Sequence, residues 1–227
     1  MEIQVYNVEK FLDEDVIKRY LPGISPYRRN KIENYRFLQD RALSLGATLL
    51  LAEVIEKYGI DEKGVTYVTG EYGKPRIKEL PFLEYNISHS GTMVALVYHD
   101  NKTNNDPETM ASCGIDVEMV KGHGDRMADR ILAPEEFAIY KALKNQNVSA
   151  ANAFFTREWT RKEAYLKYKG TGLDFTSKTV YEVLELGKLE KKGLYFNEIK
   201  VITDCADYCV AACSNVKDIK DCKVVKY

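Results

Sequence analysis

The sequence has no run of about 18 consecutive apolar residues, the length that a membrane-spanning helix needs. Its opening residues, MEIQVYNVEKFLDEDV, lack the basic and apolar regions of a secretory signal. With 33 Lys and Arg against 34 Asp and Glu, it also lacks the basic excess of a general nucleic-acid or membrane surface. We therefore expect a cytoplasmic protein with neither a nucleic-acid nor a membrane partner.

Cysteine is also scarce, with five residues in the chain. An odd number of cysteines without a secretory signal argues for reduced thiols and against a disulfide framework. Cys205, Cys209 and Cys213 allow two interpretations, a cluster-binding motif or small residues on one buried face of a strand. The even spacing and the frequent burial of free cysteine favour core packing.

The 227 residues are 45% hydrophobic and 30% charged, which is typical of a globular protein with one large or two small domains. In the first half, apolar residues recur at helical spacing over 26–37 and 38–59. Strand-like patterns follow over 65–69, 83–88 and 92–99. The polar segment 100–112 is the best candidate for a domain boundary.

The second half repeats this order in outline. We expect a strand over 114–120, helices over 134–144 and 149–168, and further strands near 179–185, 193–202, 207–213 and 223–226. The patterns predict an α+β fold with two similar α+β subdomains, residues 1–105 and 106–227.

Two acids interrupt the apolar strand GIDVEMV. Asp116 and Glu118 are two residues apart, so on a strand their side chains lie on one face, about 7 Å apart at the backbone. Such acids are unfavourable in an apolar strand unless they are paired or bind a cation. An edge strand with this face in water is the alternative, and the spacing alone does not decide between them.

The segment FFTREWTRKEAYLKYKGTGL contains the only tryptophan. Trp159, Lys162 and Glu163 share one helix face, and Lys167 follows one turn later. One interpretation is a buried tryptophan beside a surface ion pair between Glu163 and Lys167. In the other, Glu163 joins Asp116 and Glu118 as an oxygen ligand set, which suits Mg²⁺ better than zinc.

These residues also carry a family resemblance. GIDVE, followed about 40 residues later by WTRKEAYLK, resembles the paired signature G-[IV]-D-x-E and W-[ST]-x-K-E-A-x-x-K of the 4′-phosphopantetheinyl transferases. EYGKP and NISHSG resemble two further motifs of the larger Sfp-type branch, which activates peptide and polyketide synthases. The four blocks occur in the family's order over residues 71–173.

The resemblance implies an enzyme that transfers the 4′-phosphopantetheine arm of coenzyme A to a serine of an acyl, peptidyl or aryl carrier protein domain. The implied co-product is adenosine 3′,5′-bisphosphate, and the implied cofactor is Mg²⁺. It also implies that the two subdomains form a pseudo-dimer in one chain, with coenzyme A in the cleft between them and the protein a monomer.

Site roles follow from the matched positions in the second half. Asp116, Glu118 and Glu163 match metal ligands, and Glu163 also matches the base towards the carrier serine, with a metal-bound water as the alternative base. Lys162 and Lys167 match positions that hold phosphate oxygens or orient the acids. Trp159 is expected to brace its helix against the GIDVE strand.

In the first half, Lys74 matches a coenzyme A contact near the adenosine, and Ser88 and His89 match phosphate contacts. Lys31 and Arg41 match basic positions near the 3′-phosphate, although a solvated helix face explains them equally well. Adjacent strand residues point to opposite faces, so Ser88 and His89 cannot pair as nucleophile and base, and a hydrolase is disfavoured.

Two departures from the family pattern are the length of segment 100–112 and Thr160, where serine is more frequent. Two other functions stay open: a non-catalytic module that binds coenzyme A or carrier domains, and another Mg²⁺-dependent phosphoryl or nucleotidyl transferase. The intact acids and lysines argue against the binding module, which has less need of a metal site.

Overall fold

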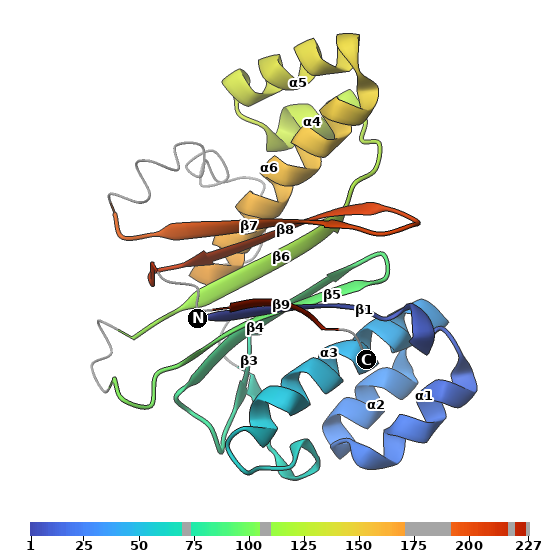
Figure 1. The fold of residues 1–227 in the computed structure, drawn as a ribbon, viewed down its shortest axis with the longest axis vertical. Helices are drawn as coiled ribbons and strands as arrows, with labels where there is room; N and C mark the ends of the chain where they lie inside the picture. Colours follow the sequence, from blue (N-terminus) through green and yellow to red (C-terminus); the bar gives the residue numbers. More distant parts are fainter. Residues whose placement is uncertain (70–73, 105–109, 171–191, 218–220, 226–227) are drawn as a thin grey trace. The chain divides into compact units, whose positions relative to one another are not determined.

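The computed structural model describes residues 1–69, 74–104, 110–170, 192–217 and 221–225. The chain divides into two compact units, Met1–Ala111 with Ile219–Tyr227 and Ser112–Asp218. Each unit combines helices with a small sheet, which confirms the predicted α+β class (Figure 1). In the described part of the chain, no helix has the length and apolar character needed to cross a bilayer.

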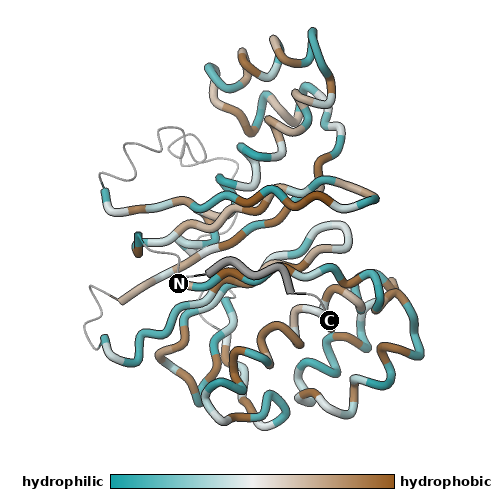
Figure 2. Tube along the Cα trace, in the orientation of Figure 1, coloured by the Kyte–Doolittle hydropathy of each residue, from teal (hydrophilic) through white to brown (hydrophobic). Residues whose placement is uncertain are grey.

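The first unit is built on a four-stranded sheet in the order β4-β5-β1-β9, with helix α3 packed on β1 and β5. Hydrophobic residues line its strands and recur along α3, where they form a common core (Figure 2). The strands of this sheet are β1 (Glu2–Asn7), β4 (Leu83–Ser90), β5 (Met93–Asp100) and β9 (Asp221–Val225), and β2 (Tyr67–Thr69) and β3 (Pro75–Ile77) form a separate two-stranded sheet. The helices are α1 (Glu14–Tyr20), α2 (Pro26–Asn34) and α3 (Leu38–Glu56), with 3-10 turns at Glu9–Phe11, Leu21–Gly23 and Glu62–Gly64.

Two strands of this sheet differ from the sequence-based expectation. The sequence patterns did not indicate β1, which pairs antiparallel with β5. The last strand, β9, pairs in parallel with β1 and so belongs to the first unit, whereas the predicted division placed it in the second. Local periodicity indicates that a segment is a strand, but it carries no information about a partner 200 residues away.

The two ends of segment 100–112 are held together by one buried side chain. Asn101 Nδ2 donates to the Ala111 carbonyl at 3.0 Å, and the Ala111 N–H donates to Asn101 Oδ1 at 2.9 Å. These paired hydrogen bonds imitate a strand ladder and close the segment at its base. The boundary between the units follows directly, at Ala111 and Ser112.

The second unit has an antiparallel sheet in the order β6-β8-β7, and helix α6 packs across β6 and β8. The predicted strands over 193–202 and 207–213 and both predicted helices are found here, while 179–185 lies outside the described residues. Cys205 precedes β8 and is exposed, so only Cys209 and Cys213 share a strand face. The elements are β6 (Cys113–Met119), β7 (Tyr195–Ile202), β8 (Asp207–Ser214), α4 (Asp125–Ile131), α5 (Pro134–Gln146) and α6 (Val148–Lys169).

Helix α6 and strand β6 touch through their backbones at Gly114. A Cβ atom on Gly114 would lie 2.2 Å from the Tyr168 nitrogen and 2.3 Å from the Ala164 oxygen. Only glycine permits so close an approach of two backbones. The glycine of GIDVE therefore fixes how the C-terminal half of α6 lies on the strand that carries Asp116.

Replacing Gly114 by alanine should therefore lower the free energy of unfolding by roughly 3 kcal/mol, the upper part of the range for overpacking, because neither backbone can yield locally. Gly122→Ala is the matched control, since the nearest atom to its added Cβ would be 3.8 Å away. Urea unfolding of both variants provides the measurement. A Gly114→Ala protein as stable as the wild type would show that α6 does not rest on β6 in this way.

Candidate active site

Strand β6 turns its acidic face towards helix α6. Lys167 Nζ donates to Asp116 Oδ1 at 2.6 Å, and Trp159 Nε1 lies 3.4 Å from Glu118 Oε1. Asp116 is only 3% exposed. Although β6 lies at an edge of the described sheet, its acids are covered by a helix, so the solvated-edge interpretation is wrong for Asp116.

Glu163 on α6 is close enough to Asp116 and Glu118 for their negative charges to affect it. Burial and the negative charges of Asp116 and Glu118 together raise the pKa of Glu163 from its ordinary value near 4.5 to about 7, against the opposing effect of Lys167. Glu163 and Lys167 therefore do not form the isolated surface ion pair that was one alternative. The structure brings the three predicted carboxylates into one electrostatic cluster.

This cluster has the donor chemistry for a divalent cation. Three carboxylates offer hard oxygen ligands, and a cation would relieve the repulsion that raises the pKa of Glu163. Within the described residues, however, no three acidic, histidine or cysteine side chains already form a complete metal site. The two observations are compatible, because charges interact over several ångströms whereas Mg²⁺ ligands must converge to about 2.1 Å.

Lys162 does not point to the acids, although it precedes Glu163. Its Nζ donates to the Ile131 carbonyl at 2.8 Å and to Glu136 Oε2 at 2.5 Å, and the residue is 1% exposed. Burial lowers the pKa of Lys162, and Glu136 opposes that shift. The side chain thus faces the α4–α5 region, a placement that the sequence did not indicate.

Trp159 connects the acidic face to the helical part of the unit. Its ring packs against a cluster centred on buried Ile131, Tyr140 and Phe155, while its N–H reaches Glu118. The sequence led us to expect that the ring braces α6 against the GIDVE strand, whereas only the N–H reaches that strand and the ring packs on the helical cluster. An amphipathic ring suits a position with an apolar body and a polar edge.

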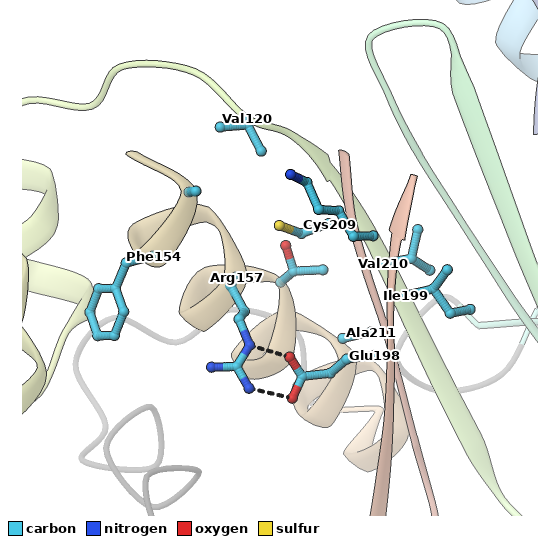
Figure 3. A pocket seen from close by; sticks show the side chains of 11 residues that line it. Val120, Phe154, Arg157, Glu198, Ile199, Cys209, Val210 and Ala211 are labelled. Carbon is cyan, nitrogen blue, oxygen red and sulfur yellow. Dashed lines mark hydrogen bonds and ion pairs between the residues drawn. The ribbon is translucent and has the colours of Figure 1, made fainter. Parts of the chain in front are cut away.

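A cavity of about 390 Å³ opens where the N-terminal half of α6 lies over β7 and β8 (Figure 3). Phe154, Ala211 and Cys209 contribute to its walls, and an ion pair between Arg157 and Glu198 lies across it. Burial raises the pKa of the Cys209 thiol to about 11, so the group is protonated at neutral pH and unsuited to act as a nucleophile.

In the first unit, two of the predicted coenzyme A contacts have carboxylate partners. Arg41 forms a bidentate pair with Glu14 at 2.8 and 3.0 Å, and Lys74 pairs with Glu84. Lys31 is exposed on α2. The positions of Lys31, Arg41 and Lys74 do not test whether these residues contact coenzyme A, so their assignments stay predictions.

Ser88 and His89 lie on opposite faces of β4. The structure buries Ser88 at 6% exposure and leaves His89 exposed. This placement agrees with the alternation of side chains along a strand, and the prediction that the two neighbours cannot act together as nucleophile and base stays a prediction.

Arg28 is a basic residue that the sequence analysis missed. It is 5% exposed, and its guanidinium lies over the Tyr67 ring at 4.5 Å. Among the described residues, its Nε and Nη2 have no hydrogen-bond partner. Although Lys31, one turn later, is largely exposed, partial desolvation and the Arg28 charge lower its pKa. The run of charges in PYRRNK gave no signal that one arginine is buried.

Comparisons with known proteins agree with this arrangement. Residues 112–213 match the family described as the 4′-phosphopantetheinyl transferase superfamily, and residues 14–101 match the 4′-phosphopantetheinyl transferase N-terminal family. The chain is 29% identical over 174 residues to 4′-phosphopantetheinyl transferase Sfp of Bacillus subtilis (strain 168), covering 76% of this chain and 72% of that protein.

Two further relatives are similar over shorter spans. A Bacillus subtilis 4′-phosphopantetheinyl transferase is 30% identical over 156 residues, covering 68% of this chain and 64% of its own length. The 4′-phosphopantetheinyl transferase psf-1 of Bacillus pumilus is 29% identical over 160 residues, covering 70% of this chain and 63% of its own length. The chain thus spans slightly less than two thirds of the length of these two relatives.

The raised pKa of Glu163 predicts a pH-dependent stability in metal-free protein. An acid whose pKa is raised by folding destabilises the folded state as pH rises from about 4.5 to about 7, and the loss is complete above that range. In chelator, Glu163→Gln should therefore be more stable than wild type at pH 8, by about 1–3 kcal/mol after allowance for partial exposure.

The difference should vanish at about pH 3, well below the ordinary pKa, because the carboxyl is then protonated in both states. Denaturant unfolding at both pH values measures it, with exposed Glu33→Gln as the control. A Glu163→Gln variant that is less stable than wild type at pH 8 would contradict the acid cluster.

Proposed function

The chain belongs to the 4′-phosphopantetheinyl transferase superfamily, in its Sfp-type branch, and we propose that it modifies acyl, peptidyl or aryl carrier protein domains with the phosphopantetheine arm of coenzyme A. Two family matches extend over both units in order. The observation that carries the proposal is the electrostatic coupling of Glu163 on α6 with Asp116 and Glu118 on β6, where Lys167 also donates to Asp116.

In the proposed reaction, the carrier serine oxygen attacks the phosphorus that bears the pantetheine. The new serine–phosphorus bond forms as the bond from that phosphorus to the bridging oxygen breaks. The serine proton passes to a base, and adenosine 3′,5′-bisphosphate leaves with the bridging oxygen. Such a displacement requires mainly positioning and neutralisation of charge.

The second unit supplies these needs through few residues. Asp116, Glu118 and Glu163 would hold Mg²⁺, which supplies neutralisation of the pyrophosphate charge when it is bound. Lys167, which donates to Asp116, holds that carboxylate in place and brings a cation to the site. The acceptor of the serine proton is either Glu163 or a water at the site, because a Glu163 carboxylate that held Mg²⁺ would not keep the pKa close to 7 that it has without a cation.

The first unit is proposed to bind the adenosine end of coenzyme A. Lys74, Ser88 and His89 are the candidate contacts, and Lys31 and Arg41 are candidates for the 3′-phosphate. Arg28 adds a buried positive charge one turn before Lys31, which favours an anion in this region. A cytoplasmic monomer is the state that we propose.

A non-catalytic binding module would also hold coenzyme A or a carrier domain. It has no need of three clustered carboxylates, whose mutual repulsion is unfavourable unless a cation is recruited. The clustered acids favour the enzyme, and another Mg²⁺-dependent phosphoryl transfer differs from the proposal only in its product.

Purified protein with coenzyme A and Mg²⁺ should add the mass of one phosphopantetheine arm to the serine of an apo-carrier. Mass spectrometry across fatty-acid, polyketide and peptide carriers measures the product and identifies the preferred class. A chelator should stop the reaction, and Mg²⁺ should restore it. Glu163→Gln should lower turnover by at least 100-fold.

Unmodified carriers in every class, with folded protein and metal present, would overturn the transferase proposal. Coenzyme A binding without modification would support the binding module instead. Addition of a different mass would identify another phosphoryl or nucleotidyl transferase.

Dephospho-coenzyme A, which lacks the 3′-phosphate, should bind about ten- to a hundredfold more weakly than coenzyme A, the effect of one charge-assisted hydrogen bond. If His89 contacts that phosphate, His89→Ala should weaken coenzyme A binding and leave dephospho-coenzyme A binding nearly unchanged. Isothermal titration of both ligands against both proteins completes the cycle. If His89→Ala weakens the binding of both ligands equally, His89 does not contact the 3′-phosphate.

A further inference from the structure

Lys162 and Glu136 form a buried ion pair between α6 and α5. Their side chains are 2% and 12% exposed, and Nζ and Oε2 are 2.5 Å apart. We propose that Glu136 is a positioning residue for the transfer reaction, which acts through Lys162 to fix the rotation of α6 and hence the placement of Glu163. This inference rests on the proposed function.

Glu136 is itself firmly held. The oxygen that accepts from Lys162 also accepts the Ala133 N–H at 3.1 Å, at the start of α5. The carboxylate therefore caps its own helix and cannot turn away without leaving that N–H unsatisfied. Lys162 meets a fixed acceptor on α5, and the Ile131 carbonyl at the end of α4 is its second acceptor.

Lys162 is poorly placed to bind a phosphate. Two of its three donors are engaged inside the protein, and the residue is 1% exposed. Moving the ammonium to a substrate would leave the Glu136 charge buried without its partner, which is strongly unfavourable. Lys167, with a side chain 29% exposed and its Nζ on Asp116, is the lysine at the acids.

Other charged side chains on α6 are paired as well, one pair within the helix and one to β7. Arg161 Nη1 donates to both carboxylate oxygens of Glu158 at 2.9 Å, and both residues are about 5% exposed. Arg157 donates to Glu198 on β7, the ion pair drawn across the cavity (Figure 3). The helix is thus tied to β7 by Arg157, to β6 at Gly114 and to α5 by Lys162.

Glu163 follows Lys162 directly, so any rotation of α6 that relaxes the ion pair also moves this carboxyl. Side-chain ends lie about 5–6 Å from a helix axis, so a 10° rotation displaces them by about 1 Å. A 1 Å misplacement can reduce a reaction rate by about 100-fold. A remote pair on α5 can therefore control the chemistry without touching the substrate.

The test compares Glu136→Gln and Lys162→Met with Glu135→Gln, an exposed change in the same turn of α5. Carrier modification by the full chain with coenzyme A and Mg²⁺ gives kcat and KM. We expect kcat to fall about 10- to 100-fold in the first two variants, with KM for coenzyme A within about threefold of wild type. Glu135→Gln should match wild type.

If Lys162 instead contacts a phosphate of coenzyme A, the effects on kcat and KM should be reversed. Lys162→Met would then raise KM for coenzyme A, and Glu136→Gln would leave kcat unchanged; either result overturns the proposal. The double variant Glu136→Leu with Lys162→Met replaces the pair by apolar side chains and should recover the melting temperature. Its kcat should stay at least tenfold low, and full recovery of kcat would reduce the pair to a stabilising role.

Amide hydrogen exchange of metal-free protein provides a readout that needs no activity. Glu136→Gln should speed exchange over residues 159–167, and Glu135→Gln should not. If the wild-type protein modifies no carrier, the proposed function fails and this exchange result alone decides whether Glu136 positions α6. Unchanged exchange in Glu136→Gln would contradict the inference.

Discussion

The backbone contact between α6 and β6 is the constraint on which the candidate site depends. A strand can approach a helix so closely only where it has no side chain, and Gly114 provides that position two residues before Asp116. The contact brings Glu163 and Lys167 over the acidic face of β6. Without it, Asp116 and Glu118 would be two charges on an exposed edge strand.

The helix that makes this contact buries many charges. Glu158, Arg161 and Lys162 are each about 6% exposed or less, which is rare unless charges are paired. Arg161 pairs with Glu158 within the helix, Lys162 connects α6 to Glu136 on α5, and the more exposed Arg157 connects it to Glu198 on β7. The pKa of Glu163 is raised to about 7. We interpret the helix as a rigid support that carries Glu163, an acid that a bound cation would stabilise.

The periodicity of the sequence predicted much of this arrangement. The two-residue spacing of Asp116 and Glu118 places them on one face, and the helical spacing of Trp159 and Glu163 places the third acid on α6. The α+β class and most strands and helices followed from the same local patterns. Such patterns succeed where a residue's role depends on neighbours a few positions away.

Contacts between segments far apart in the chain could not be predicted from the sequence patterns, for a physical reason. Lys162 was expected on the same face as Glu163, yet a carboxylate 26 residues earlier determines where its ammonium lies. The burial of Arg28 and the pairing of β9 with β1 likewise depend on distant segments. Periodicity identifies an element and its apolar face, whereas the partner of a buried charge is set by which elements meet.

A crystal structure with coenzyme A and Mn²⁺, which shares the oxygen-ligand preference of Mg²⁺ and scatters anomalously, tests the central claim most directly. The account predicts one anomalous peak bound by oxygens of Asp116, Glu118 and Glu163, with Lys162 Nζ still on Glu136. A metal held by other residues would contradict the acid site. A Lys162 ammonium on the pyrophosphate would contradict the support that we assign to α6.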